Sequence, residues 1–551
     1  MRPSIPRFLT CLLLAVASAN SPAVAGDVIH DLQKQAIEDG RSDVAHWGND
    51  PNDYTAWGTH SNRLIPIYTF GTKDAGDGVD LSAWTGDNSP YRSEQALRRL
   101  YGKVPADTLN PQAVYCDQAN LADLQRAAVE AGKKHIFVVV FDGMDWQTTQ
   151  AAAIASTGRV PYTSGRGTGL HFLDYMADGT SQYGFMVAAP HNQGSSVDVD
   201  TQTVRNPGGT RPGGYDVAKA GPNPWTAGND SWYPMGLISE KKAGPHPYPD
   251  SAATATAICS GVKTYNGSIN VGPTGERVST VAHEVQQDGW LVGAVSSVPI
   301  SHATPASAYA HNVTRNDYQD ITRDLLGLPS ISHPDTPLTG LDVLIGAGFG
   351  TKRDEDRNQG ENYVSGNRYL ADRDLEAIDV ANGGKYRTVV STPGIDGGTA
   401  LREAARQAAA NGERLFGFFG IGRYGHLPFQ TADGDYQPAP GRSGKAESYS
   451  AEELLQNPTL PEMTTAALEY LEARDKPFWL LVESGDVDWA NHDNNLDNSI
   501  GAVRSGDAAI KVITDWVEEN SNWSESLMIV TADHGHYLHL MKPEALAGGG
   551  E

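Results

Sequence analysis

Residues 136–141 of the chain read Ile-Phe-Val-Val-Val-Phe, and Asp142 and Gly143 follow at once. A continuous apolar run of this kind is typical of a strand that is buried on both faces of a parallel sheet. The preceding residues 121–131 place apolar side chains three and four positions apart, as an amphipathic helix does. A helix followed by a doubly buried strand predicts an α/β fold.

Short apolar runs of the same kind recur further along the chain, with helical patterns between several of them. The runs occupy residues 290–295, 343–345, 415–419, 478–482 and 527–530, and the helical patterns include residues 400–410 and 464–473. This alternation predicts a mostly parallel central sheet with helices on both faces. Residues 206–229 are rich in glycine and proline, and they predict a loop insertion at the surface.

Residues 1–25 have the composition of a secretory signal peptide. Arg2 and Arg7 precede a largely apolar stretch, residues 8–17, and residues 23–25 offer the small-residue cleavage site Ala-Val-Ala. We therefore expect an exported protein, periplasmic or extracellular. The apolar stretch is too short to span a bilayer, and we expect no membrane-spanning segment.

Residues 26–120 are polar and rich in turn signals, and they contain no recognisable chemistry. We interpret them as an N-terminal extension and residues 121–551 as the catalytic domain. Once the signal peptide is removed, Cys116 and Cys259 are the two remaining cysteines. An exported protein permits a disulfide between them, and two buried thiols fit equally well, so their pairing stays open.

The charge balance narrows the range of partners, because 42 basic residues stand against 67 acidic ones and the formal net charge is −25. Nucleic acid and anionic membrane surfaces attract basic patches, so we expect neither as the main partner. A small anionic substrate remains compatible with this charge. Bound metal ions reverse the local potential, and their carboxylate ligands add to the acidic count.

Metal-type side chains follow three of the predicted strands. Asp142, Glu483 and the pair Asp533 and His534 each come directly or shortly after one of the apolar runs. Open α/β sheets collect their sites at the carboxyl ends of the strands. The sequence therefore predicts that these side chains meet at one edge of the sheet.

The stretch from residue 250 reads Asp-Ser-Ala-Ala-Thr-Ala-Thr-Ala, which places Ser251 at or near the N-terminus of a helix. Free N–H groups and the positive end of the helix dipole favour a phosphate there. An isolated serine at this position would be an ordinary N-cap. The metal-type side chains elsewhere in the chain favour a catalytic serine.

Three further segments carry residues of ligand type. His302 and Thr304 stand two residues apart, so both side chains point to the same side of an extended segment. Asp488 and His492 stand one helical turn apart, which is the spacing of a chelating pair. The planar guanidinium of Arg315 can donate hydrogen bonds to two phosphate oxygens at once. A carboxylate with an imidazole suits zinc, and a glutamate with a hydroxyl suits magnesium.

Six separated stretches of the chain resemble the alkaline phosphatases, and they occur in that family's order. They are Asp-Gly-Met from residue 142, Asp-Ser-Ala-Ala-Thr-Ala-Thr-Ala from residue 250 running on to Gly-Val-Lys-Thr-Tyr-Asn, His-Ala-Thr-Pro-Ala from residue 302, Ala-His-Asn-Val-Thr-Arg from residue 310, Val-Glu-Ser-Gly-Asp-Val-Asp-Trp-Ala-Asn-His from residue 482, and Val-Thr-Ala-Asp-His-Gly-His from residue 530. The resemblance implies an alkaline phosphatase-like fold.

The resemblance also implies a role for each matching position. Ser251 would be the nucleophile that forms a phosphoserine, and Arg315 would bind two non-bridging phosphate oxygens. The metal sites would be a zinc held by Asp142, Asp533 and His534, a second zinc held by Asp488 and His492, and a magnesium ion held by Asp142, Thr304 and Glu483. His302 and Trp489 would border these sites, and His536 would orient a ligand carboxylate.

One position of the family pattern has no counterpart in the expected place. In the family, the second zinc has a further histidine well downstream of the Asp-His-Gly-His segment. Here 17 residues follow His534, with His536 and His539 among them. We predict that His426 replaces the missing histidine. The alternatives are His539 and a zinc that is weakly held.

The predicted function is hydrolysis of small phosphate monoesters through a phosphoserine, at neutral to alkaline pH and outside the cytoplasm. A serine hydroxyl needs a metal ion or a base to become a good nucleophile, and no protease-like base accompanies Ser251. One alternative is hydrolysis of phosphodiesters or sulfate esters on a related scaffold. Another is a phosphate- or metal-binding protein without turnover. The oligomeric state stays open, with a homodimer as one option.

Overall fold

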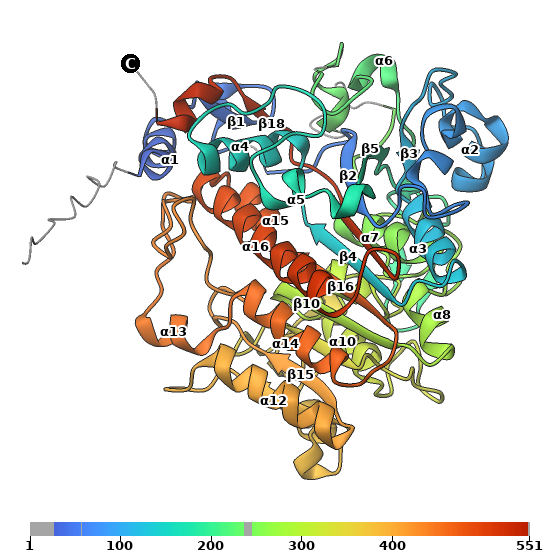
Figure 1. Ribbon diagram of the computed structural model, residues 1–551, viewed down its shortest axis with the longest axis vertical. Helices are drawn as coiled ribbons and strands as arrows, with labels where there is room; N and C mark the ends of the chain where they lie inside the picture. Colours follow the sequence, from blue (N-terminus) through green and yellow to red (C-terminus); the bar gives the residue numbers. More distant parts are fainter. Residues whose placement is uncertain (1–26, 57, 227, 236–244, 549–551) are drawn as a thin grey trace, which may run out of the picture.

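The computed structural model describes residues 27–56, 58–226, 228–235 and 245–548, so the predicted signal peptide lies outside the described residues. At its centre is a ten-stranded sheet (Figure 1). In spatial order its strands are β14 (Tyr386–Val390), β15 (Arg414–Phe418), β11 (Val343–Ala347), β10 (Leu291–Pro299), β16 (Phe478–Ser484), β4 (His135–Phe141), β17 (Ser526–Ala532), β2 (Ile65–Phe70), β5 (Gln182–Val187) and β3 (Cys116–Asp117). Neighbouring strands are parallel except where β2 pairs with β17 and β5. The predicted mostly parallel sheet is therefore confirmed.

Helices cover both faces of the sheet, as predicted. One layer contains α4 (Trp146–Thr157), α12 (Gly397–Asn411), α14 (Leu460–Glu472) and α16 (Leu496–Asn520), which pack against one another. The other contains α3 (Asn120–Glu130), α7 (Ser251–Ser260), α8 (Val281–Gln287) and α9 (Ala303–Ser307), with α7 in contact with the other three. Figure 1 shows α12, α14 and α16 as a row on one side of the strands, with α3, α7 and α8 on the other.

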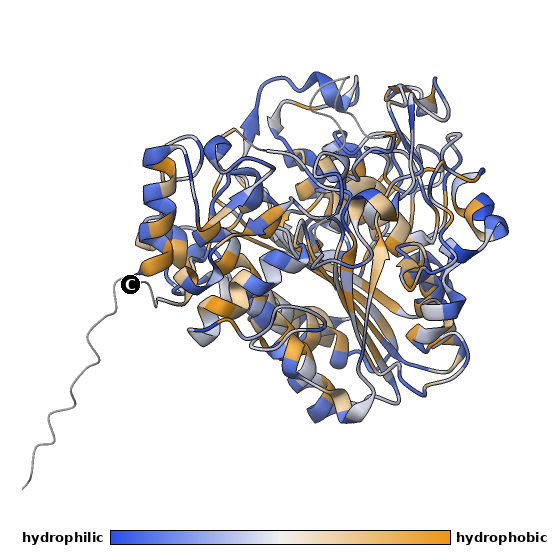
Figure 2. Ribbon diagram, turned by 90° about the horizontal axis from the view of Figure 1, so that it is seen from above, coloured by the Kyte–Doolittle hydropathy of each residue, from blue (hydrophilic) through white to orange (hydrophobic). Residues whose placement is uncertain are grey.

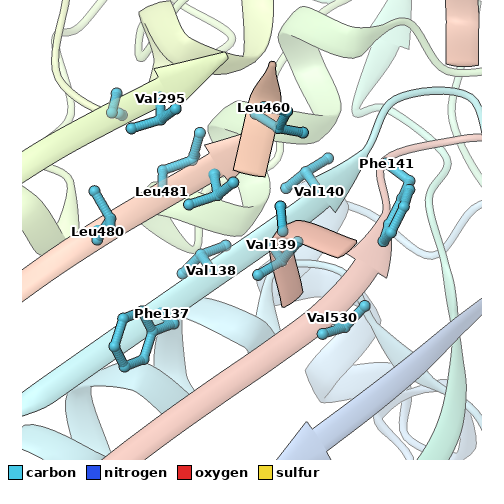
Figure 3. Close-up of a cluster of buried hydrophobic side chains, with 14 of the residues drawn as sticks. Phe137, Val138, Val139, Val140, Phe141, Val295, Leu460, Leu480, Leu481 and Val530 are labelled. Atoms are coloured by element: carbon cyan, nitrogen blue, oxygen red, sulfur yellow. The ribbon is translucent and has the colours of Figure 1, made fainter. Parts of the chain in front are cut away.

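Strand β4 lies near the middle of the sheet because its sequence can be buried on both faces. Its residues 136–141 are at most 1% exposed. Val139 pairs in register with Val482 of β16 and Val530 of β17. Figure 3 shows Val139 and Val530 in a cluster of buried side chains with Leu460 of α14, and Figure 2 shows the strands mainly in the hydrophobic colour. Burial of such a side chain contributes roughly 1.5–3 kcal/mol, which favours a doubly covered strand.

The N-terminal segment is part of this sheet and is not a separate extension. After α1 (Val28–Asp39), strand β1 (Ala45–Trp47) pairs with β18 (Leu538–Leu540) near the other end of the chain. Strand β2 then inserts between β17 and β5. The expected boundary at residue 120 therefore runs through the central sheet, because that sheet includes strands from both sides of the boundary.

Two smaller expectations concern the glycine- and proline-rich stretch and the two cysteines. The glycine- and proline-rich stretch is mainly irregular, with a short strand β9 (Arg211–Pro212) and a short helix α6 (Val217–Ala220), yet Tyr215 within it is buried. Cys116 and Cys259 are both free and buried, and burial raises the pKa of each thiol.

Among the described helices, none combines the length and apolarity that a membrane crossing requires.

Candidate metal centre

Three adjacent strands deliver the metal-type side chains to one edge of the sheet, as the sequence predicts. Asp142 follows β4, Glu483 is the last residue but one of β16, and Asp533 and His534 follow β17. Strand β4 lies between the other two. Parallel strands end on the same side, so all these side chains converge although more than 300 residues separate the first from the others.

Ser251 is the first residue of α7 and is 1% exposed. Asp250 caps this helix, and its carboxylate accepts hydrogen bonds from the N–H groups of Ala253 and Gly267. The serine Oγ lies 3.2 Å from His534 Nε2 and 3.4 Å from Asp142 Oδ1. The helix N-terminus is thereby directed at the group of metal-type side chains.

The first group of ligand atoms has the spacing of a tetrahedral zinc site. His534 Nε2 lies 3.4 Å from Asp142 Oδ1 and 3.4 Å from Asp533 Oδ2. Ser251 Oγ lies at similar distances from two of these atoms. Atoms bound at about 2.0 Å around one zinc ion lie about 3.3 Å apart in a tetrahedron. Burial lowers the pKa of His534 well below its usual range, so its imidazole is neutral, as a ligand must be.

Gly143 makes this arrangement possible. Its N–H donates to Asp533 Oδ1 at 2.9 Å, which leaves Oδ2 to face His534. Its φ is +75°, and a Cβ there would lie 2.8 Å from the His536 ring. The Asp-Gly pair after β4 is therefore required for close approach as well as for the turn.

The second group consists of His60, Asp488, His492 and His536. His60 Nε2 and His492 Nε2 lie 3.0 Å apart, and each is 3.5 Å from Asp488 Oδ1. His536 Nε2 lies 2.6 Å from the same carboxylate oxygen, so it orients Asp488, which is the role that the sequence comparison implies for it.

The tautomers of the two facing histidines follow from their other contacts. His60 Nδ1–H donates to the carbonyl of Pro249 at 2.9 Å, and His492 Nδ1–H donates to the carbonyl of Gly58 at 3.1 Å. Both Nε2 atoms therefore carry lone pairs that face each other beside a carboxylate. Such an arrangement is stable with a cation between the three atoms, either a proton or a metal ion that displaces it.

His60 is a candidate metal ligand that sequence reasoning missed. It lies in the turn-rich segment that we interpreted as free of chemistry, and no spacing pattern links it to Asp488. The apolar run that follows His60 and forms β2 could have indicated its place, because a strand there predicts that His60 lies near one edge of the sheet. The N–H of Ser61 donates to the carbonyl of Gly535 at 2.7 Å and so holds this loop beside β17.

The structure does not place His426 or His539, the two histidines considered as the missing ligand, in the group around Asp488. His426 Nε2 lies 3.3 Å from Glu447 Oε1, and its ring packs 5.1 Å from that of Trp489. His539 stacks on His46 with ring centroids 5.4 Å apart. Neither belongs to the groups of ligand atoms found in the described part of the chain, because His60 occupies the place beside Asp488.

Two further carboxylate oxygens, on Asp142 and on the nearby Glu483, are candidates for a third cation site. Asp142 Oδ2 and Glu483 Oε1 are buried and have no hydrogen-bond partner. Burial raises the pKa of Glu483 to about 8, and the nearby hydroxyls of Ser296 and Thr304 moderate this rise. Buried carboxylate oxygens without donors are costly unless a cation balances them, and an all-oxygen set suits magnesium.

Ser251 and three residues of the second group line a cavity of about 570 Å³. Its wall consists of Gly58, His60, Ser251, His302, Arg315, Asn316, Tyr318, Arg442, Asp488, Trp489, His492 and Asp493. Arg315 Nη1 donates to Asp250 Oδ2 at 3.2 Å, which holds the guanidinium beside the start of α7. His302 lies against Trp489 with ring centroids 5.6 Å apart, and burial lowers its pKa to about 3.

The comparisons with known proteins agree on one family. The family model described as alkaline phosphatase matches residues 219–546. Alkaline phosphatase 4 of Bacillus subtilis (strain 168) is 29% identical over 288 residues, which are 52% of this chain and 49% of that protein. The alkaline phosphatase of Escherichia coli (strain K12) is 28% identical over 334 residues, which are 57% of this chain and 63% of that protein.

A solved structure is also similar. The cold-active alkaline phosphatase from the psychrophile Shewanella sp. aligns with 73% of this chain and 68% of its own, at 20% identity and a TM-score of 0.43. The chain spans about half to two thirds of the length of the curated relatives named above.

Proposed function

Since this chain belongs to the alkaline phosphatase family, we propose that it hydrolyses phosphate monoesters through a phosphoserine on Ser251. One observation carries the proposal. Ser251 Oγ lies 3.2 Å and 3.4 Å from His534 Nε2 and Asp142 Oδ1, within the same cluster of ligand atoms and at a helix N-terminus. A hydroxyl placed there is positioned both for activation and for contact with a phosphate.

The residues present fit two zinc ions and one magnesium ion. The first zinc would be held by Asp142, Asp533 and His534, as the resemblance of the sequence motifs implies. The second zinc would be held by Asp488 and His492, with His60 as a third ligand. Asp142, Thr304 and Glu483 would hold the magnesium. When bound, zinc supplies a Lewis acid that lowers the pKa of the serine hydroxyl and offsets charge on the leaving oxygen.

The chain's own residues then carry out two displacements. In the first, Ser251 Oγ forms a bond to phosphorus, the bond to the alcohol oxygen breaks, and the alcohol leaves with a proton. In the second, a water oxygen forms a bond to phosphorus and the bond to Oγ breaks. Inorganic phosphate leaves, and the serine regains its proton. Each step is an in-line exchange of one oxygen for another.

Arg315 and the first turn of α7 would stabilise the phosphoryl group during both steps. The charge of the group in transfer is spread over three oxygens. The guanidinium is held by Asp250, the residue that caps α7, so it and the N-terminal N–H groups lie on the same side of the site. A guanidinium and backbone N–H groups that are fixed before the substrate arrives need no reorganisation during the reaction.

Substrate class and location follow as part of the same proposal. The wide cavity accommodates small phosphate monoesters of varied alcohols, and the acidic chain disfavours nucleic acid as a partner. We place the enzyme outside the cytoplasm, in keeping with the signal-like composition of residues 1–25.

The test is steady-state hydrolysis of an aryl phosphate monoester by the chain loaded with zinc and magnesium, beside its Ser251→Ala variant. An aryl phosphodiester and an aryl sulfate are measured in parallel. We expect monoester turnover that falls by several orders of magnitude in the variant, with metal content retained. Faster turnover of the phosphodiester or the sulfate than of the monoester would favour phosphodiesterase or sulfatase activity. Absence of turnover with every ester would leave a binding protein.

A further inference from the structure

A second cluster of ligand-type side chains lies outside the metal centre. It consists of His311, which follows α9, Asp324, which lies in α10 (Tyr318–Leu326), and His333 in the loop beyond that helix. His311 Nδ1 lies 3.0 Å from His333 Nε2, and His333 Nε2 lies 3.9 Å from Asp324 Oδ2. The proposed reaction uses none of these side chains.

The tautomer of His311 is set as it is for the histidines of the metal centre. Its Nε2–H donates to the carbonyl of Val278 at 3.0 Å, so the lone pair lies on Nδ1 and faces His333. The ring of His283 stacks on that of His311, with centroids 5.1 Å apart and an interplanar angle of 8°. A ring held by a carbonyl on one edge and by stacking on one face is preorganised as a ligand.

The cluster contains a buried carboxylate that forms no ion pair with a lysine or arginine among the described residues. Asp324 is 0% exposed and accepts hydrogen bonds from the Ser330 hydroxyl at 2.5 Å and the N–H of His311 at 2.9 Å. Within the described part of the chain its one ion-pair partner is His333, at 3.9 Å. A cation bound between this carboxylate and the two imidazoles would contact all three groups, whose ligand atoms lie within 4.8 Å of one another.

Arg277 offers the competing explanation for the same contacts. Its Nη1 lies 3.3 Å from His333 Nδ1 and donates to the carbonyl of Ser332 at 2.5 Å. If the Arg277 contact set the tautomer, His333 Nε2–H would donate to His311 Nδ1 and no ion would be needed. That arrangement leaves Asp324 Oδ2 without a hydrogen bond from His333, because the two atoms lie 3.9 Å apart. A metal ion satisfies all three ligand atoms at once.

We propose that His311, Asp324 and His333 bind one divalent transition-metal ion, of zinc type, at a site separate from the Ser251 centre. Two imidazoles and a carboxylate are a set that zinc prefers, with a water molecule as the fourth ligand. His333 is 13% exposed at its side chain, which gives the ion a path from solvent. The ion links His311 to His333 and so closes residues 311–333 into a loop, and this loop contains Arg315.

Zinc content tests the site independently of turnover. The full chain is saturated with zinc, freed of excess by gel filtration, and counted by mass spectrometry for the wild type, His333→Ala and a control, His171→Ala. His171 is a half-buried histidine that hydrogen-bonds Thr514. We expect His333→Ala to lose one zinc per chain relative to both other proteins. Equal zinc content in all three would overturn the proposal.

Two further measurements keep the result interpretable. If His333→Ala fails to fold by circular dichroism, His333→Gln and Asp324→Asn take its place, and retention of all zinc by both would overturn the site. Amide hydrogen exchange of the zinc-loaded proteins tests the fastening role. Faster exchange in residues 311–333 of His333→Ala supports it, and unchanged exchange contradicts it. Because neither readout requires ester hydrolysis, failure of the proposed function would leave this test intact.

Discussion

His60 and His492 are separated by 432 positions in the chain, yet their Nε2 atoms lie 3.0 Å apart. On the other side of each ring, Nδ1 is hydrogen-bonded to a backbone carbonyl, that of Pro249 for His60 and that of Gly58 for His492. The second metal group therefore exists only when the loop before β2 is docked against β17. Completion of the site is thus coupled to formation of the antiparallel pair between these two strands.

Replacing His60 by alanine removes one ligand atom from the second group and leaves Ser251 and Asp142 in place. We expect one zinc fewer per chain and a kcat for an aryl phosphate that is lower by at least about 100-fold. Mass spectrometry and steady-state kinetics measure both effects. His539→Ala is the matched control, and equal losses in the two variants would contradict the assignment of His60.

Replacing Arg315 by lysine keeps the charge and removes the bidentate fork. We expect inhibition by inorganic phosphate to weaken by about 10-fold, with unchanged metal content, because two oriented donors become one point charge. The inhibition constant is measured by steady-state kinetics. Arg423→Lys, at an exposed pair with Glu453, serves as the control. An unchanged inhibition constant in Arg315→Lys would exclude direct contact with phosphate.

The metal-free protein should lose stability as the pH rises. Burial raises the pKa of Glu483 from 4.5 to about 8, so the folded chain binds this proton more tightly than the unfolded chain does. The contribution is fully present below about pH 4.5 and is lost as the pH rises through about 8. We expect the free energy of unfolding of the metal-free wild type to fall relative to Glu483→Gln, by at most about 1.4 kcal/mol per pH unit.

Urea denaturation in a chelator, at a series of pH values, measures this difference. Added magnesium should reduce it, because the ion takes the place of the proton. Parallel pH profiles for the wild type and Glu483→Gln would show that the carboxyl group titrates normally in the fold.

Shortening a side chain of β4 should destabilise the whole sheet. Val139 lies at the middle of this strand and is 1% exposed. We expect Val139→Ala to lower the free energy of unfolding by roughly 1–3 kcal/mol through lost burial and a residual cavity. Val114→Ala, at a position 45% exposed, should change it by less than about 0.5 kcal/mol. Urea denaturation compares the two, and equal effects would contradict the described core.

The pattern of apolar runs was sufficient to predict six parallel strands, β4, β10, β11, β15, β16 and β17, because burial on both faces leaves an unbroken apolar sequence such as residues 136–141. The parallel strands β14 and β3 were not among the predicted runs. Strand β2 was missed because it is antiparallel and follows a polar, turn-rich segment. Asp142, Glu483, Asp533 and His534 were predictable as neighbours, since residues at the carboxyl ends of adjacent parallel strands meet whatever the chain length between them.

By itself, the sequence determined the residue types of the site, the position of Ser251 at the start of a helix, and the sheet edge at which the first group of ligands gathers. These depend on local periodicity and on the polarity of parallel strands. Only the tertiary structure decided that His60, and not His426, stands beside Asp488. That choice rests on the docking of one antiparallel strand, and such long-range pairing leaves no periodic trace in the sequence that surrounds the histidine.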